Sequence, residues 1–213
     1  MRVIAIDGPA GAGKSTVARA LAARLHLQYL DTGAMYRAVT LAAIQREIHV
    51  EDRELVAELA REITIDVDND GVFVDGVDVT AEIRSPEITG AVSVVAANSG
   101  VRAEMRARQV AWAVERGGGV IEGRDIGSVV FPDAELKLYL TASPRTRAQR
   151  RVAEAGGNVD EIEASIAARD RYDSSRADSP LTTTDGSVVV DTTGLDVEAV
   201  LAHIEALIAS LQS

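Results

Sequence analysis

The chain of 213 residues contains no cysteine and only two lysines, and aromatic residues make up just 3% of it. Without cysteine it can form no disulfide, no thiolate nucleophile and no Cys-ligated metal site. It also lacks an apolar run of about 18 residues, which a membrane-spanning helix needs. The apolar stretch near the N-terminus is too short for a signal peptide. These absences predict a cytoplasmic protein with no membrane contact.

The chain also has few basic residues relative to acidic ones, and its formal net charge is −11. Such a charge repels polyanions, which argues against nucleic acid as a partner. Any anion that the chain does bind must meet a local cluster of positive groups. Apolar residues make up 46% of the sequence, as in folded globular proteins. We expect a monomer with one core, with or without smaller inserts.

Short β-branched runs alternate with stretches rich in Ala, Leu and Arg, a pattern typical of a parallel sheet covered by helices. Strands are expected at residues 3–6, 28–30, 119–122, 136–140 and 187–190. Helices are expected at residues 13–25, 34–46, 144–154 and 196–211. The sequence therefore predicts an α/β fold.

Between about Ile48 and Pro86 the pattern changes. After a short helix, residues 63–67 and 72–74 alternate between apolar and polar on either side of the turn signal DNDG, and VDVTAEI follows a second turn signal, DG. This predicts a small antiparallel insert. Two or three strands alone are only marginally stable, so the insert must pack on its neighbours or move as a flap.

The stretch GPAGAGKST at residues 8–16 matches the pattern GxxxxGK[ST] between an expected strand and an expected helix. Such a loop directs backbone N–H groups at phosphate, and its glycines allow close approach. Lys14 adds a point charge that can follow a moving phosphoryl group, and Ser15 would offer its hydroxyl to Mg²⁺. The alternative is a glycine-rich turn with a solvated lysine. The predicted ATP-binding loop comprises Gly8, Pro9, Ala10, Gly11, Ala12, Gly13, Lys14, Ser15 and Thr16.

A nucleotide-binding loop does not identify a reaction, because GTPases, ATPases and small-molecule kinases share it. A GTPase would need an Asn-Lys-x-Asp motif for base recognition. The second lysine, Lys137, lies in ELKLYL, so the chain has no such motif. The sequence therefore excludes the GTPase class.

Seven arginines lie between residues 145 and 176. Two isoleucines and three charged residues recur here at helical steps of four, three, four and three: Ile162, Ile166, Arg169, Asp173 and Arg176. This spacing places them on one helical face, which the isoleucines mark as buried. Because unpaired buried charges are costly, we expect these to line a cleft for an anionic ligand. The alternative is a surface pair between Arg169 and Asp173, which stabilises a helix by only a few tenths of a kcal/mol.

Three of these seven arginines, Arg147, Arg150 and Arg151, form a basic patch on the expected helix at 144–154. The glycine pair GG that follows could serve as a hinge, which predicts a lid that closes over a triphosphate. A solvated helix surface would look similar and remains the alternative.

Two motifs follow expected strands, where open parallel sheets place their ligand groups. They are GRD at residues 123–125 and DTGAMYR at residues 31–37. In the second motif, Asp31 or Thr32 could merely cap a helix. The three histidines show no metal-site or triad spacing, and we expect them to be structural or surface groups.

The motifs GPAGAGKST, LDTGAMYR, DVTAEIR, EGRDIG, RAQRR and RDRYDSSR occur in this order, and in this the chain resembles the bacterial cytidylate kinase family over nearly its full length. The resemblance implies a P-loop core with a five-stranded parallel sheet at residues 1–33, 87–143 and 158–213. It implies a segment at residues 34–86 that binds the nucleoside monophosphate and carries the antiparallel insert. A helical lid would occupy residues 144–157. The implied reaction is transfer of the γ-phosphoryl of ATP, with Mg²⁺, to the 5′-phosphate of CMP or dCMP.

The same resemblance implies roles for individual residues. Three side chains would contact the cytosine: Ser93, Arg102 and Asp173. Two would lie toward the ribose: Thr32 and Asp125. Four would clamp the monophosphate: Arg37, Arg124, Arg169 and Arg176. The expected catalytic groups are Lys14, Arg124, Arg147, Arg151 and Arg169, while Arg150 would bind ATP and Ser15 the metal.

Three other functions remain open on the same residues. The first is a kinase for another small acceptor, such as UMP, dTMP or a sugar acid. The second is a non-catalytic switch in which ATP orders the lid for a protein partner, although a sensor needs no second anion site. The third, ATP-driven binding of nucleic acid, conflicts with the acidic charge.

Overall fold

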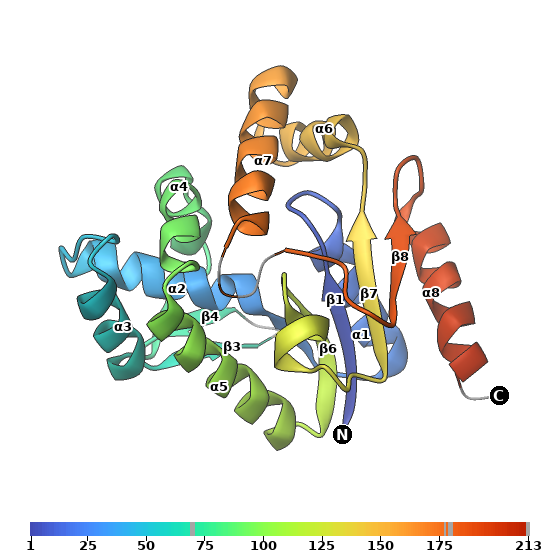
Figure 1. Cartoon of the computed structure of the whole chain (residues 1–213), viewed down its shortest axis with the longest axis horizontal. Coiled ribbons are helices and arrows are strands. Elements are labelled where there is room, and N and C mark those ends of the chain that lie inside the picture. Colours follow the sequence, from blue (N-terminus) through green and yellow to red (C-terminus); the bar gives the residue numbers. More distant parts are fainter. Residues whose placement is uncertain (69–70, 177, 179–180, 212–213) are drawn as a thin grey trace. The chain divides into compact units, whose positions relative to one another are not determined.

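The computed structural model describes residues 1–68, 71–176, 178 and 181–211, and it confirms the α/β class (Figure 1). Five parallel strands form one sheet in the order β2-β6-β1-β7-β8. Their bounds are β1 (Arg2–Asp7), β2 (Tyr29–Asp31), β6 (Gly118–Glu122), β7 (Leu136–Thr141) and β8 (Ser187–Asp191). All five expected strands are therefore confirmed, with ends that differ by at most one residue.

The internal contacts divide the chain into two units. The first unit comprises residues 1–28 and 117–213, and the second comprises residues 29–116. Strands β6, β1, β7 and β8 belong to the first unit, whereas β2 opens the second. No helix in the described part of the chain is long and apolar enough to cross a membrane.

Strand β1 lies inside the sheet of the first unit. Its residues Val3 to Ile6 are at most 3% exposed, and Ala5 pairs with Ile121 of β6 on one side and Lys137 of β7 on the other. A strand covered on both faces reads as a continuous apolar run, which is how VIAI appears in the sequence. The carboxyl end of β1 leads directly into the glycine loop.

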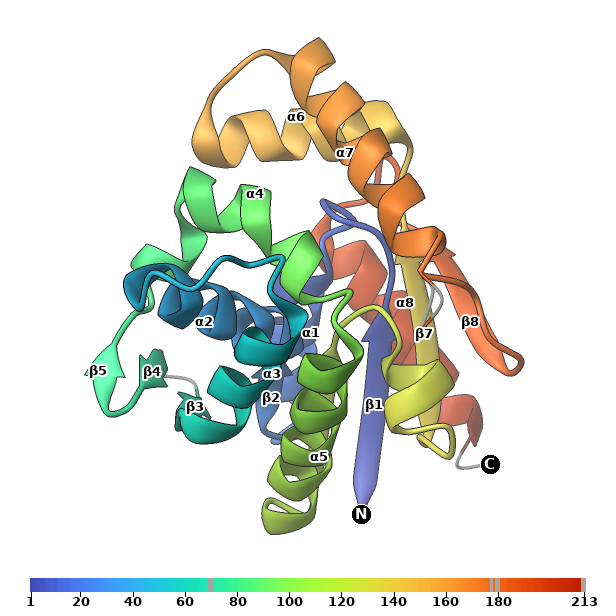
Figure 2. The same cartoon turned by 60° about the vertical axis from the view of Figure 1, so that its left-hand side comes forward.

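Helices of the first unit cover the sheet and extend beyond it. Helices α1 (Lys14–Leu25) and α8 (Val197–Leu211) pack together, and α1 also contacts β1 and β6. Helices α6 (Pro144–Ala155) and α7 (Val159–Ser174) form a packed pair beyond the carboxyl ends of β1 and β7 (Figure 2). A π-helical turn, η2 (Ile126–Val130), follows β6. The expected helices at 13–25, 144–154 and 196–211 are thus confirmed to within one residue.

Helices α2 (Thr32–Gln45), α3 (Arg53–Glu62), α4 (Pro86–Val95) and α5 (Ser99–Glu115) make up most of the second unit, with the turn η1 (Glu82–Arg84). Helix α2 begins two residues before its expected start because Asp31 caps it and accepts the N–H of Ala34. The structure also contains α4 and α5, which the sequence analysis did not predict.

The predicted antiparallel insert is present in the second unit. It consists of β3 (Ile65–Val67), β4 (Val72–Val74) and β5 (Val77–Asp78), paired in that order. Two residues of the turn DNDG, Asn69 and Asp70, lie outside the described residues. Strands β3 and β4 pack on α2, which supplies the support that so small a sheet requires.

The junction of β1 and β6 depends on a glycine. Gly118 has a φ of +124°, and a Cβ there would lie 2.0 Å from the backbone oxygen of Arg2. We therefore expect Gly118→Ala to lower the free energy of unfolding by about 2 to 3 kcal/mol through steric and backbone strain. Gly90→Ala, at an open position inside α4, is the control and should raise it by about 0.5 to 1 kcal/mol. Urea titrations of both variants measure the effect, and an unchanged midpoint for Gly118→Ala would contradict it.

Candidate active site

The glycine loop leaves β1 after Asp7 and enters α1 at Lys14. Gly8 has a φ of +142°, and a Cβ on it would lie 2.0 Å from the backbone oxygen of Leu140 in β7. Only glycine fits against the neighbouring strand at this point. Within the described residues, the N-terminus of α1 has no side-chain cap and no acidic residue in its first turn. The positive end of the helix dipole is therefore open to an anion.

Lys14 is buried at the start of α1, with 9% of its surface exposed. Its Nζ donates a hydrogen bond of 2.9 Å to the backbone oxygen of Pro9, so the side chain curls back over the loop. The alternative of a solvated lysine in a simple turn is therefore wrong. Ser15 and Thr16 follow in the first turn of α1 with exposed side chains.

Alternate carbonyl groups of the loop accept hydrogen bonds from side chains outside it. Arg124 Nη1 donates to the oxygen of Gly8, and Arg147 Nη1 donates to that of Ala10 at 3.0 Å. The hydroxyl of Thr192 lies 3.2 Å from the oxygen of Ala12 and 3.0 Å from that of Thr141, and its single hydrogen is shared between these two acceptors. In contrast, the N–H groups of residues 10–13 donate to no other group in the described part of the chain. The loop therefore holds its acceptors outward and leaves its donors for an anion.

Arg124 links this loop to α7. Its Nε donates to Asp173 Oδ2 at 3.2 Å, and Asp173 also accepts from Arg176 Nη2. Asp173 is only 1% exposed, so the alternative of a surface pair with Arg169 is wrong. The expected helical face extends to Asp173, but α7 ends at Ser174, and Arg176 reaches the same carboxylate from beyond the helix.

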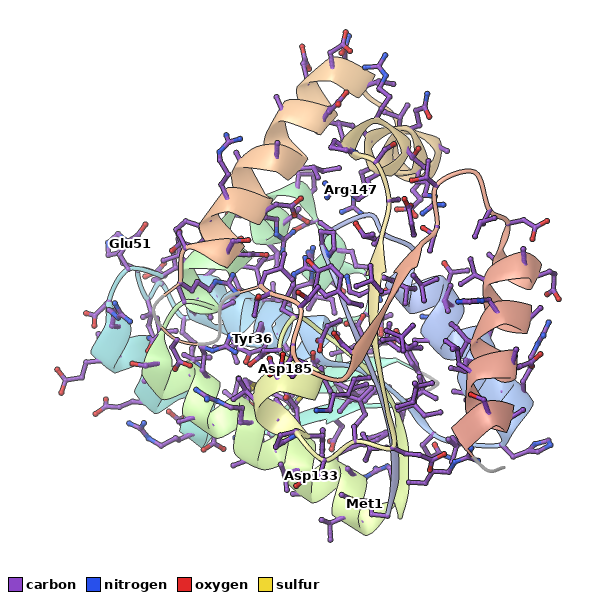
Figure 3. All side chains as sticks on the ribbon, turned by 45° about the vertical axis from the view of Figure 1, so that its right-hand side comes forward. Met1, Tyr36, Glu51, Asp133, Arg147 and Asp185 are labelled. Atoms are coloured by element: carbon purple, nitrogen blue, oxygen red, sulfur yellow. The ribbon has the colours of Figure 1, made fainter. Side chains whose placement is uncertain are left out.

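The basic patch on α6 divides into buried and exposed members. Arg147 is 6% exposed and lies where α6 meets α7 (Figure 3). Arg150 donates to the hydroxyl and the carbonyl oxygen of Thr192, at 2.9 and 2.8 Å. Arg151 has a side chain that is 43% exposed and pairs with Glu154. The solvated-surface alternative thus describes Arg151 but not the other two, and the predicted catalytic role of Arg151 has no support from these contacts.

Asp7, at the end of β1, was not among the predicted site residues. Its Oδ1 accepts the N–H of Ile126 at 2.9 Å and its Oδ2 accepts the N–H of Gly127 at 2.8 Å. Burial raises the pKa of Asp7 to about 6, opposed by these two N–H groups, while the charge of Asp125 raises it further and that of Lys14 lowers it. The only sequence signal was an aspartate that ends an apolar strand just before the loop. Asp7 therefore holds the turn after GRD against the base of the loop.

Four of the predicted residues lie in the second unit: Thr32, Arg37, Ser93 and Arg102. Arg37 Nη1 donates to the oxygen of Ile83 and the hydroxyl of Thr89, both at 2.9 Å. Arg102 is 1% exposed, donates to the oxygen of Ala96 at 3.1 Å and lies 5.7 Å from the ring centre of Tyr36. Thr32 is buried at the start of α2, and Ser93 is half-buried on α4.

The first unit carries the other predicted residues, among them Asp125, which is buried, and Arg169, which is half-buried on α7. Within this unit the structure brings together the loop, Arg124, Arg147, Asp173 and Arg176 through the contacts above. A single site made of residues from both units stays a prediction, as does the division into core, insert and lid.

The buried carboxylate of Asp7 predicts a pH dependence of stability. The pKa of Asp7 is about 6 in the folded protein and 3.8 ordinarily. The stability that its protonated side chain provides is therefore complete below pH 3.8 and is lost as the pH rises through 6. Over that range the loss is about 3 kcal/mol. The unfolding free energy of Asp7→Asn, relative to wild type, should therefore increase by about this amount between pH 4 and 7.

Urea unfolding at four pH values between 4 and 7 measures this difference. Asp133→Asn, which removes an exposed carboxylate of the same unit, is the control for the loss of one negative charge. A constant difference between Asp7→Asn and wild type across the range would show that Asp7 does not titrate there.

Comparison with known proteins places these features in a family. The family model described as cytidylate kinase matches residues 4–210. A cytidylate kinase of Bacillus cereus is 43% identical, over 98% of this chain and 96% of that protein. A bifunctional pantoate ligase/cytidylate kinase of Synechococcus is 49% identical over 98% of this chain, and the chain spans 41% of its length. A gluconokinase structure from Sinorhizobium meliloti has the same fold, with a TM-score of 0.51 at 14% identity over 99% of this chain and 93% of that one. The chain belongs to the cytidylate kinase family.

Proposed function

We propose that this chain transfers the γ-phosphoryl group of ATP to the 5′-phosphate of CMP, with dCMP as a second acceptor. Membership of the cytidylate kinase family supports the reaction. The observation that carries the proposal is the loop at residues 8–15: arginines and a threonine contact the carbonyls of residues 8, 10 and 12, while the N–H groups of residues 10–13 donate to no other group in the described part of the chain. Such a loop suits the phosphates of a nucleotide. From composition and charge alone, we further propose a cytoplasmic monomer that binds no nucleic acid.

At the donor end, the loop and Lys14 bind the phosphates of ATP. Lys14 already lies over the loop, where its Nζ donates to the oxygen of Pro9 and adds a positive charge. Arg147 donates to the loop from α6, and Arg150 Nη1 lies beside it, 3.5 Å from where a Cβ on Gly13 would be, so both supply positive charge there. Arg151 would have to leave Glu154 to take part, so we assign it the weakest role of the three.

The residues present fit a magnesium ion that arrives with ATP. Ser15 presents an exposed hydroxyl in the first turn of α1, and the carboxylate of Asp7 lies within electrostatic range of Lys14 and of Asp125. The described residues contain no cluster of three acidic or histidine side chains that would hold a metal alone. Oxygen ligands in small number are what Mg²⁺ uses when phosphates and waters complete its shell. Ser15 is the proposed protein ligand of this ion, which would supply positive charge to the phosphates of ATP.

At the acceptor end, we assign CMP to residues of both units. From the first unit, Arg124, Arg169 and Arg176 bind the monophosphate, Asp125 lies toward the ribose and Asp173 toward the cytosine. From the second unit, Arg37 binds the monophosphate, Thr32 lies toward the ribose, and Ser93 and Arg102 contact the base. The pairing of Asp173 with Arg124 and Arg176 supports the first-unit part of this grouping, because one cluster there carries both signs of charge.

The reaction needs little more than alignment and charge neutralisation. The attacking oxygen of CMP is already anionic, so no side chain has to remove a proton from it. Catalysis then rests on holding donor and acceptor in line and on positive groups that stabilise the charge of the transferring phosphoryl. Lys14, Arg124, Arg147 and Arg169 are the groups that we assign to this task. Closure of the helical lid would exclude water and limit hydrolysis of ATP.

ADP formation from MgATP with CMP, dCMP, UMP, dTMP and gluconate, measured singly, tests the proposed reaction. We expect CMP and dCMP to be preferred. If ADP forms faster with another acceptor, that acceptor and not CMP is the preferred substrate. ADP formation that does not depend on any acceptor would contradict the kinase assignment.

The two lysines of the chain allow a matched test of the donor end. Lys14→Met keeps the aliphatic length but removes the charge from the loop, and we expect kcat to fall by about a hundredfold or more, as when a preorganised donor is lost. Lys137→Met removes the only other lysine, from β7, and should leave kcat within about twofold of wild type. Steady-state kinetics with MgATP and CMP measure both. Equal rates for the two variants would exclude the role of Lys14.

Base recognition by Asp173 predicts a selective loss. In Asp173→Asn the side chain keeps its size, so Arg124 and Arg176 keep a polar neighbour, but the charged acceptor for the cytosine amine is gone. We expect affinity for CMP to weaken by about 1.5 to 3 kcal/mol, the scale of a hydrogen bond to a charged group. UMP, which has no amine to donate, should lose less. Competitive titration of both nucleotides measures the difference, and equal losses would mean that Asp173 does not read the base.

A further inference from the structure

Helix α7 presents two carboxylates to the glycine loop, each through an arginine. Asp173 pairs with Arg124, which donates to the oxygen of Gly8. Asp170, three residues earlier, pairs with Arg147, which donates to the oxygen of Ala10. The two arginines come from different parts of the first unit, one after β6 and one from α6. The glycine loop is thus connected to α7 at Gly8 and at Ala10.

The contacts of Arg147 use one edge of its guanidinium group. Nε donates to the oxygen of Ala142 at 3.1 Å, and Nη1 donates to the oxygen of Ala10 at 3.0 Å and to Asp170 Oδ2 at 2.6 Å. Both hydrogens of Nη1 are therefore used. Nη2 donates to no group in the described part of the chain. Because the guanidinium is planar and rigid, fixing Nε and Nη1 also fixes the direction of Nη2.

Asp170 helps to orient the guanidinium group of Arg147, in addition to the two backbone oxygens that this group contacts. Its side chain is 20% exposed, so screening by water limits what the ion pair adds to stability. The bond to Arg147 is nevertheless short, and it is the only contact of this guanidinium with an opposite charge among the described residues. The second oxygen of Asp170 is buried without a hydrogen-bond partner there. A carboxylate held in this way is better explained by the placement of Arg147 than by stability.

We propose that Asp170 is a positioning residue for the donor end of the site: it holds Arg147 against the loop so that Nη2 faces the triphosphate. The inference rests on the proposed kinase function and deepens it. Asp170 then serves phosphate transfer through Arg147, whereas Asp173, on the same helix, serves the acceptor. The two carboxylates should differ in which kinetic constant they change.

A double-mutant cycle tests the proposal in the full chain. In the wild-type background, Asp170→Asn should lower kcat/KM for ATP about tenfold, the scale of coupling between contacting charged residues. It should leave the ratio of CMP to UMP activity unchanged. In the Arg147→Ala background, Asp170→Asn should have no further effect, because the group that it positions is absent. Asp170→Glu, which keeps the charge, should recover part of the activity.

Asp160→Asn is the matched control, because Asp160 pairs with Arg145 between the same two helices but is 80% exposed. It should leave all constants unchanged. An equal loss from Asp170→Asn in both backgrounds, or no loss in either, would overturn the proposal. Thermal unfolding of each variant identifies any that fails to fold. If Asp170→Asn fails to fold, Asp170→Glu takes its place in the cycle, and an equal loss in both backgrounds, or no loss in either, again overturns the proposal.

Failure of the proposed function would be visible separately, as a wild-type protein that forms no ADP in a CMP-dependent manner. In that case, calorimetry measures the affinity of wild type, both single variants and the double variant for MgATP. Loss of affinity in Asp170→Asn that disappears in the Arg147→Ala background would support the positioning role, and additive losses would overturn it.

Discussion

The site depends on how the carbonyl groups of the glycine loop are bound. Arg124, Arg147 and Thr192 take the oxygens of residues 8, 10 and 12 from outside the loop. A peptide group whose oxygen is fixed on one side presents its N–H on the other, so the contacts at Ala10 and Ala12 orient the N–H groups of Gly11 and Gly13. The contact at Gly8 fixes the backbone path instead, because the next residue is proline and has no N–H. Glycine permits the backbone to take this path, but the side chains around the loop hold it there.

This arrangement also explains how an acidic chain can bind two anions. The net charge of −11 repels nucleotides at a distance, so attraction must come from short-range groups. In the first unit, buried Arg147 and half-buried Arg124 each have a carboxylate partner on α7, Asp170 for Arg147 and Asp173 for Arg124. These ion pairs offset the desolvation cost of the guanidinium groups when no ligand is bound. The unused guanidinium edges and the N–H groups of the loop remain for phosphate.

Sequence patterns predicted the parts of the fold that depend on local chemistry. The VIAI run identified β1 because both faces of that strand are covered, and the Gly-Lys-Ser spacing identified the loop. Helix α4 was missed because half of its ten residues are β-branched, although Ser85 and Pro86 give the same start signal as Ser143 and Pro144. Residue spacing could not predict which partner each arginine would take, since those contacts join segments more than 20 residues apart. Asp7 was missed for the same reason.

Four arginines of the candidate site are already oriented by hydrogen bonds to backbone oxygens. Arg37 and Arg102 in the second unit, like Arg124 and Arg147 in the first, donate to backbone oxygens of their own unit. Each guanidinium has therefore already lost much of the rotamer freedom that a solvated arginine would lose on binding phosphate. Binding then exchanges or adds hydrogen bonds to groups that are already oriented. For a reaction whose catalysis consists of alignment and charge neutralisation, such preorganisation matters more than the number of positive charges.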